Sequence, residues 1–319
     1  MKLAIFGANS HIAQDLVASF ANHGGYDCHL FVRDITSVFA EADPIVKRQL
    51  FTVSEYAEFD QATHYDAILN FVGVGDPERA KAMGPTIFEV TERYDQLAMA
   101  YLKRYPASKY IFLSSGAAYG GNFEVPVSEG TKAVFSINEL RAQDWYSVAK
   151  FCAECRHRAH AEMNIVDVRV FGYFSSKQSL DARFLLSDIL KALKTGGVLG
   201  VSPENMVRDY MVPSDFFQLI ASILSSPPTN AVVDCYTLQP VDKFTLLSTV
   251  KSTYGLEYDV VGEHAKVNAT GTKSNYYSLN RHAAMFGFKP GESSMSGILK
   301  EIEVHLASAE GEECNIDHS

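Results

Sequence analysis

Short runs of apolar, β-branched and aromatic residues alternate with helix-like segments from residue 1 to about residue 170. We expect strands at 2–6, 28–32, 67–72, 110–113 and 166–171, and helices at 12–23, 86–104 and 145–160. In the segment 86–104, apolar residues recur three and four positions apart, as on one face of a helix. Strands connected through helices form parallel sheets that helices cover on both faces. The alternation therefore predicts an α/β fold of the Rossmann type, with a doubly wound parallel sheet whose ligands bind at the carboxyl ends of the strands.

The composition argues against several classes of protein. Apolar residues make up 47% and charged residues 21% of the 319 residues, as in a globular rather than a disordered chain. No apolar run approaches the roughly 18 residues of a membrane span. A net charge of −10 without a long block of lysine or arginine argues against nucleic acid as a partner. Five cysteines, an odd number, fit a reducing compartment. We therefore expect a cytoplasmic protein, and from the preceding observations one that binds neither membrane nor nucleic acid.

Residues 7–13, with the sequence GANSHIA, join the first expected strand to the first expected helix. A backbone that approaches a pyrophosphate leaves no room for a Cβ atom, and a helix N-terminus attracts the anion. Only one glycine is present; Ser10 and Ala13 stand where a second and a third would be expected. The position favours a dinucleotide loop over a plain strand–helix turn. Its expected cofactor-binding residues are Gly7, Asn9, Ser10, His11 and Ile12.

The end of the second expected strand bears on the choice of cofactor. A carboxylate there binds the ribose 2′-hydroxyl, whereas an arginine accommodates a 2′-phosphate. The first polar residue after 28–32 is Arg33, and Asp34 follows it. We therefore favour NADP(H) over NAD(H). An exposed Arg–Asp pair is the alternative interpretation, and a register error of one residue would reverse the preference.

Tyr146 and Lys150 lie one turn apart on an expected helix. A tyrosine with a pKa of about 10 is a poor base at neutral pH, but a neighbouring ammonium and a positively charged nicotinamide favour the phenolate. Lowering the pKa of the tyrosine from about 10 to about 7 corresponds to roughly 4 kcal/mol. Tyr146 can then exchange a proton with a substrate hydroxyl or carbonyl. Ser114 and Ser115 follow the strand 110–113, where a hydroxyl can bind the reacting oxygen, although turn chemistry also explains serines there.

The chain resembles the extended short-chain dehydrogenase/reductases, in particular the NAD(P)-dependent epimerase/dehydratase group that acts on nucleotide sugars. The matching segments, in order, are 7–13, 69–74, 114–120, 126–129, Tyr146 with Lys150, 169–172, 208–215, 276–280 and 286–290. The resemblance implies that Ser115, Tyr146 and Lys150 are catalytic. It also implies that the cofactor contacts Asn70, Phe71, Val72, Tyr146, Lys150 and Phe171. Ser115, Tyr146 and Arg208 would bind substrate, with the arginine on a diphosphate.

The chain departs from the family's pattern at several positions. Two glycines of the loop are missing, and the segment 88–91 lacks an asparagine that the family often carries. Gly172 replaces the usual asparagine after the crossing strand, which weakens inference about how substrate is held. The 4,6-dehydratases typically carry Thr-Asp-Glu where this chain has Ser115-Gly116-Ala117. Without an acid and a base there, dehydration is disfavoured.

The resemblance implies two domains and a homodimer. Residues 1–172 would form the NAD(P)-binding Rossmann domain, to which 206–250 would return. A smaller, mixed C-terminal domain, 173–205 with 251–307, would bind substrate, and the acidic tail 308–319 would be frayed. The expected reaction is hydride transfer at a ring carbon of a nucleotide-diphospho-sugar, with a 4-keto-sugar reductase favoured. A nucleotide-sugar epimerase with retained NAD is the alternative, and a non-catalytic nucleotide-binding protein is a further one.

Cys152, Cys155, His157 and His160 follow the catalytic pair on the same expected helix. A metal site or a redox pair is conceivable there, but such spacing on a core-packed helix usually reflects packing. We therefore expect no metal.

Overall fold

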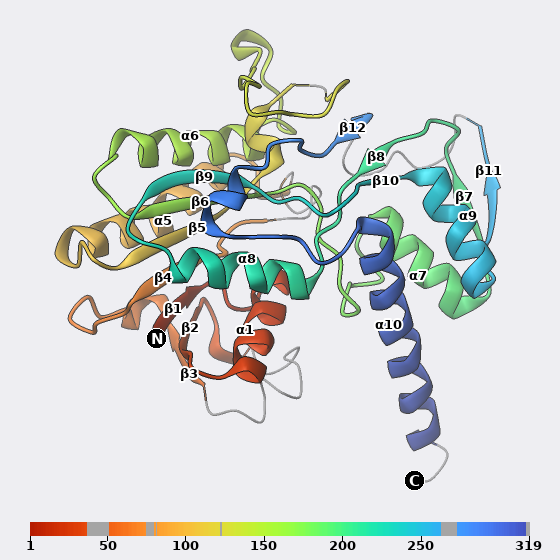
Figure 1. The fold of residues 1–319 in the computed structure, drawn as a ribbon, viewed down its shortest axis with the longest axis horizontal. Helices are drawn as coiled ribbons and strands as arrows, with labels where there is room; N and C mark the ends of the chain where they lie inside the picture. Colours follow the sequence, from red (N-terminus) through yellow and green to blue (C-terminus); the bar gives the residue numbers. More distant parts are fainter. Residues whose placement is uncertain (37–50, 75–79, 81, 122, 263–272, 317–319) are drawn as a thin grey trace.

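A parallel sheet lies between two layers of helices in the computed structural model, which describes residues 1–36, 51–74, 80, 82–121, 123–262 and 273–316 (Figure 1). Its seven strands are β1 (Lys2–Phe6), β2 (Asp27–Val32), β3 (Thr52–Glu55), β4 (Ala67–Asn70), β5 (Lys109–Ser115), β6 (Ile165–Val170) and β9 (Asn230–Asp234). They are all parallel, in the order β3-β2-β1-β4-β5-β6-β9. The order reverses between β1 and β4, and ligands bind at the carboxyl ends of strands next to such a point. The Rossmann-type prediction is confirmed.

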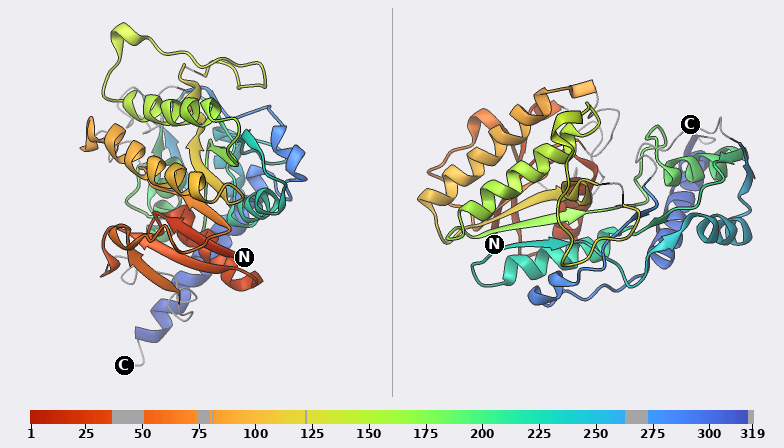
Figure 2. Two further views of the ribbon diagram at one scale, coloured as in Figure 1. Left: turned by 90° about the vertical axis from the view of Figure 1, so that its left-hand side faces the viewer. Right: turned by 90° about the horizontal axis from the view of Figure 1, so that it is seen from above.

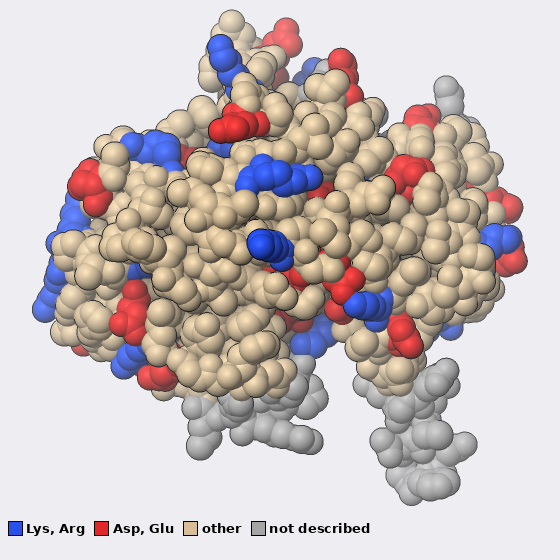
Figure 3. All heavy atoms as spheres, in the orientation of Figure 1, with Lys and Arg blue, Asp and Glu red and all other residues tan. Residues whose placement is uncertain are grey.

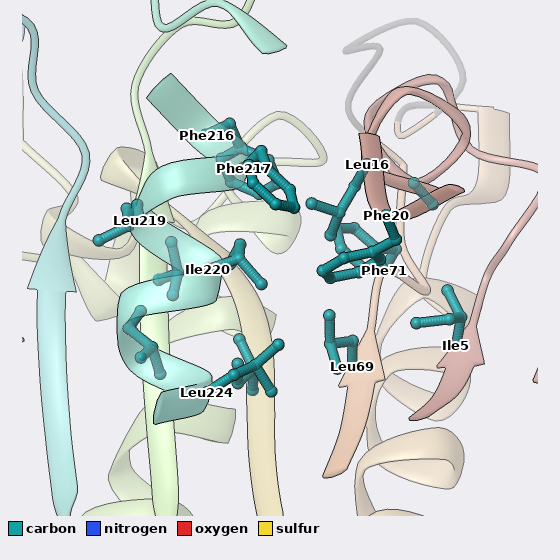
Figure 4. Packing of buried hydrophobic residues seen from close by; sticks show 14 of the residues in the cluster. Ile5, Leu16, Phe20, Leu69, Phe71, Phe216, Phe217, Leu219, Ile220 and Leu224 are labelled. Carbon is teal, nitrogen blue, oxygen red and sulfur yellow. The ribbon is translucent and has the colours of Figure 1, made fainter. Parts of the chain in front are cut away.

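Two pairs of helices cover the sheet. α1 (His11–His23) and α8 (Pro213–Ser225) pack on one face, and α5 (Thr86–Arg104) and α6 (Trp145–Ala159) on the other. Alternate residues of β1 supply the two cores: Leu3 and Ile5 join the first cluster, and Ala4 and Phe6 the second. Figure 4 shows the apolar side chains of α8 facing those of α1, β1 and β4. Burial of both faces explains why these strands read as short, continuous apolar runs.

A smaller part lies beside the carboxyl edge of the sheet (Figures 1 and 2). Its helices are α7 (Leu185–Thr195), α9 (Lys243–Tyr254) and α10 (Ser294–Ile316). Its strands are β7 (Val198–Val201), β8 (Val207–Arg208), β10 (Val241–Asp242), β11 (Glu257–Val260) and β12 (Asn275–Tyr276). β11 pairs with β7, and the other three form a sheet in the order β10-β8-β12. The two small sheets and three helices share a core of their own.

The expected strands and helices of the first 170 residues all occur, with ends within two residues of the prediction. Strand β3 was not expected, because its sequence TVSE contains no apolar run and none of its residues is buried. Of 206–250, expected to return to the larger domain, α8 and β9 lie with the large sheet. Residues 241–250 instead pack with α7, because Val241, Leu246 and Leu247 complete its core.

Helix α10 continues to Ile316, past Ser308, where the composition predicts a frayed tail. Ile298 and Ile302 anchor the helix in the smaller core, and extending an existing helix costs far less than nucleating one. Over the described part of the chain, no helix has the length and apolar character that a bilayer crossing requires. On the face drawn in Figure 3, acidic and basic side chains are interspersed.

Candidate active site

The loop after β1 closes on the turn after β4. Gly7 has φ +74°, and a Cβ atom there would lie 2.8 Å from the carbonyl carbon of Phe71 and from the amide nitrogen of Val72. Ser10 caps α1, since its hydroxyl accepts from the Ala13 amide at 3.4 Å. The loop therefore requires glycine at position 7 and presents a helix N-terminus beside it. These features fit a dinucleotide pyrophosphate.

A tyrosine that the sequence did not single out contacts this loop. The Gly7 amide donates to the hydroxyl of Tyr56, directly after β3, at 2.7 Å. Burial raises the pKa of Tyr56, and the charge of Arg33 opposes that rise. Arg33 directly follows the last residue of β2, and its side chain is exposed, as is that of Asp34. Because β3 carries no apolar run, the sequence held no signal for Tyr56.

The other predicted loop residues, Asn9, His11 and Ile12, differ in burial and in their contacts. His11 begins α1, with Nε2 2.5 Å from the Ser175 hydroxyl and 3.3 Å from the Asp15 carboxylate. Burial lowers the pKa of His11, which favours the neutral ring. Its side chain therefore ties the loop to the segment that enters the smaller part. Asn9 is exposed, and Ile12 packs partly on the core.

Asn70, the last residue of β4, shapes the turn that follows this strand. It is 1% exposed, donates from Nδ2 to the Tyr110 hydroxyl at 2.9 Å, and accepts from the Val72 amide at 2.9 Å. Both polar atoms of its side chain therefore bind protein groups. Phe71 is buried in the core, whereas Val72 continues the turn toward Gly73. The predicted cofactor contacts of 70–72 can come from this turn's backbone and from Val72.

Lys150 on α6 is 4% exposed and donates to the Leu113 carbonyl at 2.7 Å. Its ammonium lies 4.4 Å from the ring centre of Phe112 and 6.0 Å from that of Tyr146. Burial lowers the pKa of Lys150 to about 8, although the charges of Asp95, Glu154 and Asp167 oppose the fall. A hydrogen bond to β5 therefore holds the Lys150 ammonium near the Tyr146 ring.

The structure brings together the three predicted catalytic residues. Tyr146 is half-buried; burial raises its pKa, and a hydrogen bond with Ser115 opposes the rise. Desolvation, rather than the expected attraction to Lys150, therefore dominates, and the phenol form is favoured. The Ser115 hydroxyl accepts from the Ala117 amide at 3.2 Å and lies 3.2 Å from the hydroxyl of Tyr276. A second tyrosine thus reaches the same serine, which the sequence did not reveal.

Arg208 lies across the site on β8, where it pairs with Tyr276 of β12. It is 4% exposed, and its guanidinium lies 5.9 Å from the Tyr276 ring centre. The Lys273 ammonium lies 4.5 Å from the same ring. Burial and the charge of Arg208 lower the pKa of Lys273 to about 8, while Asp144 raises it. Two neighbouring cations in a desolvated place suit a phosphate group; only the arginine was predicted.

A buried cluster of four aromatic residues and a valine reaches Ser115 through Tyr276; its members are Tyr119, Phe123, Val127, Phe171 and Tyr276. Phe171, predicted as a cofactor contact, packs 5.2 Å from Tyr276, centre to centre. Phe123 has φ +55°, an uncommon conformation for a residue with a side chain. Such local strain accumulates at functional sites.

The residues after Ser115 bear on dehydration. Gly116 and Ala117, where the resemblance places the acid and base of the dehydratases, are both buried. A Cβ atom on Gly116 would lie 2.4 Å from the Phe171 ring. An aspartate there would require that ring to move, so the expected lack of dehydratase groups has a packing basis.

The cysteines of α6 and its buried histidine differ in exposure. Cys152 and Cys155 are exposed thiols, whereas His157 is buried. Within the described ranges, no group of three histidine, cysteine or carboxylate side chains is placed to hold a metal ion.

Several solved structures share this fold across nearly the whole chain. One is a UDP-glucose 4-epimerase from Thermotoga maritima with UDP-glucose: 14% identity, TM-score 0.78, covering 97% of this chain and 99% of that one. Another is a UDP-N-acetylglucosamine 4-epimerase from Methanobrevibacter ruminantium: 13% identity, TM-score 0.78, covering 96% and 98%. A third is a dTDP-glucose 4,6-dehydratase from Bacillus anthracis with NAD: 13% identity, TM-score 0.75, covering 97% and 98%. At such identities the likeness establishes the fold alone.

No curated protein sequence matches the chain significantly. A family model, that of the NAD dependent epimerase/dehydratase family, matches residues 3–236, which include the loop after β1, the serine at the end of β5 and the Tyr–Lys pair. The resemblance found in the sequence is thereby confirmed, and the chain belongs to the NAD-dependent epimerase/dehydratase family.

Proposed function

We propose that this enzyme reduces a ring ketone of a nucleotide-diphospho-sugar, most specifically a 4-keto sugar, with NADPH. The convergence of Ser115, Tyr146 and Lys150 at the carboxyl end of the sheet supports oxidoreductase chemistry. The observation that carries the choice of reductase is Arg33. An arginine at this edge of the loop suits the 2′-phosphate of a cofactor that exchanges at each turnover.

The chain's own groups fit proton donation to a ketone. Burial raises the pKa of Tyr146, so the phenol is protonated at neutral pH and can give its proton to the substrate oxygen. The Ser115 hydroxyl can donate a hydrogen bond to the same oxygen. The Lys150 ammonium, 6.0 Å from the Tyr146 ring, stabilises the resulting phenolate. When bound, the nicotinamide supplies hydride exchange with the adjacent carbon.

The substrate would be held by its diphosphate. Arg208 and Lys273 flank the Tyr276 ring, and Tyr276 itself reaches the Ser115 hydroxyl. A diphosphate on the two cations would therefore place an attached sugar close to Ser115. The UDP-glucose bound to the Thermotoga maritima epimerase supports the same class of ligand.

An epimerase that retains NAD is the second candidate. It would use the same three catalytic residues, and 4-epimerases are prominent among the structural neighbours. A Bacillus cereus UDP-glucuronic acid 4-epimerase contains NAD. The family resemblance also leads us to propose a cytoplasmic homodimer. Sedimentation equilibrium would measure the mass of the assembly.

Mass spectrometry of the nucleotide released on denaturation separates the two candidates. A reductase should leave the purification largely empty and then bind NADPH more tightly than NADH. Near-stoichiometric NAD in the denatured protein would overturn the reductase and support the epimerase.

Substitution of Arg33 tests the reason for the preference. Arg33→Ser should weaken NADPH binding about tenfold and leave NADH binding unchanged, because only NADPH carries the 2′-phosphate. Arg104→Ser, at an exposed arginine at the end of α5, is the matched control. Equal losses for both cofactors in Arg33→Ser would contradict the assignment.

A further inference from the structure

His157, near the end of α6, is completely buried (0% exposed) between two carboxylates. Nδ1 lies 2.6 Å from Asp167 on β6, and Nε2 lies 2.6 Å from Asp95 on α5. A neutral imidazole has one N–H and can donate to only one of them. Burial lowers the pKa of His157, but the two aspartates outweigh this and raise it to about 9. The ring is therefore a buried cation at neutral pH.

The hydrogen bonds continue from Asp95 across the sheet. The Tyr110 hydroxyl donates to Asp95 at 3.0 Å and accepts from Asn70 Nδ2 at 2.9 Å. The Asn70 oxygen accepts from the Val72 amide at 2.9 Å. A continuous chain thus runs from His157 on α6 to the turn after β4, and each polar group in it has one orientation.

This turn lies beside both the cofactor loop after β1 and the catalytic lysine on α6. A Cβ atom on Gly7 would lie 2.8 Å from the Val72 nitrogen, and one on Gly73 would lie 3.3 Å from the Lys150 ammonium. Lys150 shares α6 with His157. The turn after β4 is therefore linked to α6 in two ways: through the chain of hydrogen bonds to His157, and through Gly73, which lies beside Lys150.

Packing alone does not account for a histidine here. Its ring meets the edges or faces of Tyr110 and Phe112 at centre distances of 5.5 and 5.2 Å, where an apolar ring would also pack. A buried charge among carboxylates carries a desolvation cost that an apolar ring avoids. A buried hydrogen-bonded network instead fixes geometry. Asp95 Oδ2 is the exception in this network, because it accepts no hydrogen bond and lies 3.3 Å from Arg156 Nε.

We propose that His157 and Tyr110 are positioning residues, which hold the helix of Tyr146 and Lys150 in register with the turn beside the cofactor loop. The inference rests on the proposed function, because this register matters for proton transfer from Tyr146. The groups that face His157 are Asp95 on α5 with Tyr110 on β5, and Asp167 on β6. Arg156 forms an ion pair with Asp95 at 3.3 Å, and Arg158 binds Asp167 at 2.8 Å.

Tyr110→Phe breaks the chain in its middle and keeps the ring. Tyr101→Phe is the matched control, because Tyr101 is also completely buried and its hydroxyl accepts from the Tyr65 amide at 2.6 Å, outside the chain. We expect Tyr110→Phe to lower kcat at least tenfold, with the KM for nucleotide sugar within twofold. Amide hydrogen exchange in 70–74 should become at least tenfold faster. Tyr101→Phe should change neither, although both variants lose thermal stability.

Equal kcat and equal exchange in the two variants would overturn the proposal. If Tyr110→Phe does not fold, His157→Phe replaces it, with the same readouts and the same expected losses. If the native enzyme shows no turnover with any keto-sugar nucleotide, the proposed function fails. Hydrogen exchange in 70–74 then still decides whether the chain orders the turn.

Discussion

The buried cation at His157 makes a quantitative prediction about stability. Its folded pKa of about 9 lies above the ordinary value of 6.5 in an unfolded chain. The folded state therefore binds the proton more tightly, so the stabilisation is fully present below about pH 6.5 and is lost as the pH rises through 9. At 1.36 kcal/mol per pKa unit, this difference corresponds to about 3 kcal/mol in the free energy of unfolding.

Urea unfolding of the native protein and of His157→Phe, between pH 6 and pH 10, measures this contribution. Other groups titrate in the same range; the lysines at 109, 150 and 273, for example, have pKa values lowered to about 8. Because both proteins carry them, the difference between the two unfolding free energies isolates His157. We expect that difference to shrink by about 3 kcal/mol from pH 6 to pH 10. A difference that stays constant over this range would refute a charged His157.

Two substitutions test the cofactor and substrate sites. Gly7→Ala should weaken cofactor binding at least tenfold in a fluorescence titration, because a Cβ atom would press on the turn after β4. The positive φ at this position should also cost about 1–2 kcal/mol of stability. A cofactor affinity within twofold of native would contradict the loop assignment. Lys273→Met should raise the KM for nucleotide sugar about tenfold with kcat within threefold, since a charge-assisted hydrogen bond contributes about 1.5–3 kcal/mol. An unchanged KM in steady-state kinetics would remove Lys273 from the substrate site.

Much of the larger domain was predictable because its strands are buried on both faces and its helices are amphipathic. The sequence identified Ser115, Tyr146 and Lys150 because each stands at a fixed place in a strand or helix. Their side chains converge because the carboxyl end of β5 lies beside α6.

The residues that sequence reasoning missed depend on pairings between distant segments. Tyr276 and Lys273 reach the site because β12 pairs with β8, a contact that joins residues far apart in the chain. Tyr56 follows an edge strand that has no apolar run. Phe171, expected to contact the cofactor, packs its ring against Tyr276, and spacing along a strand does not reveal which neighbour a ring will meet.

The role of Tyr146 as the proton donor is the central claim, and the rate of hydride transfer in Tyr146→Phe tests it most directly. The measurement is oxidation of NADPH at saturating cofactor with a panel of 4-keto nucleotide sugars, alongside cofactor affinity. Turnover should fall about a hundredfold or more, with cofactor affinity within twofold of native, because only the proton is lost. Near-native turnover in Tyr146→Phe would contradict the claim.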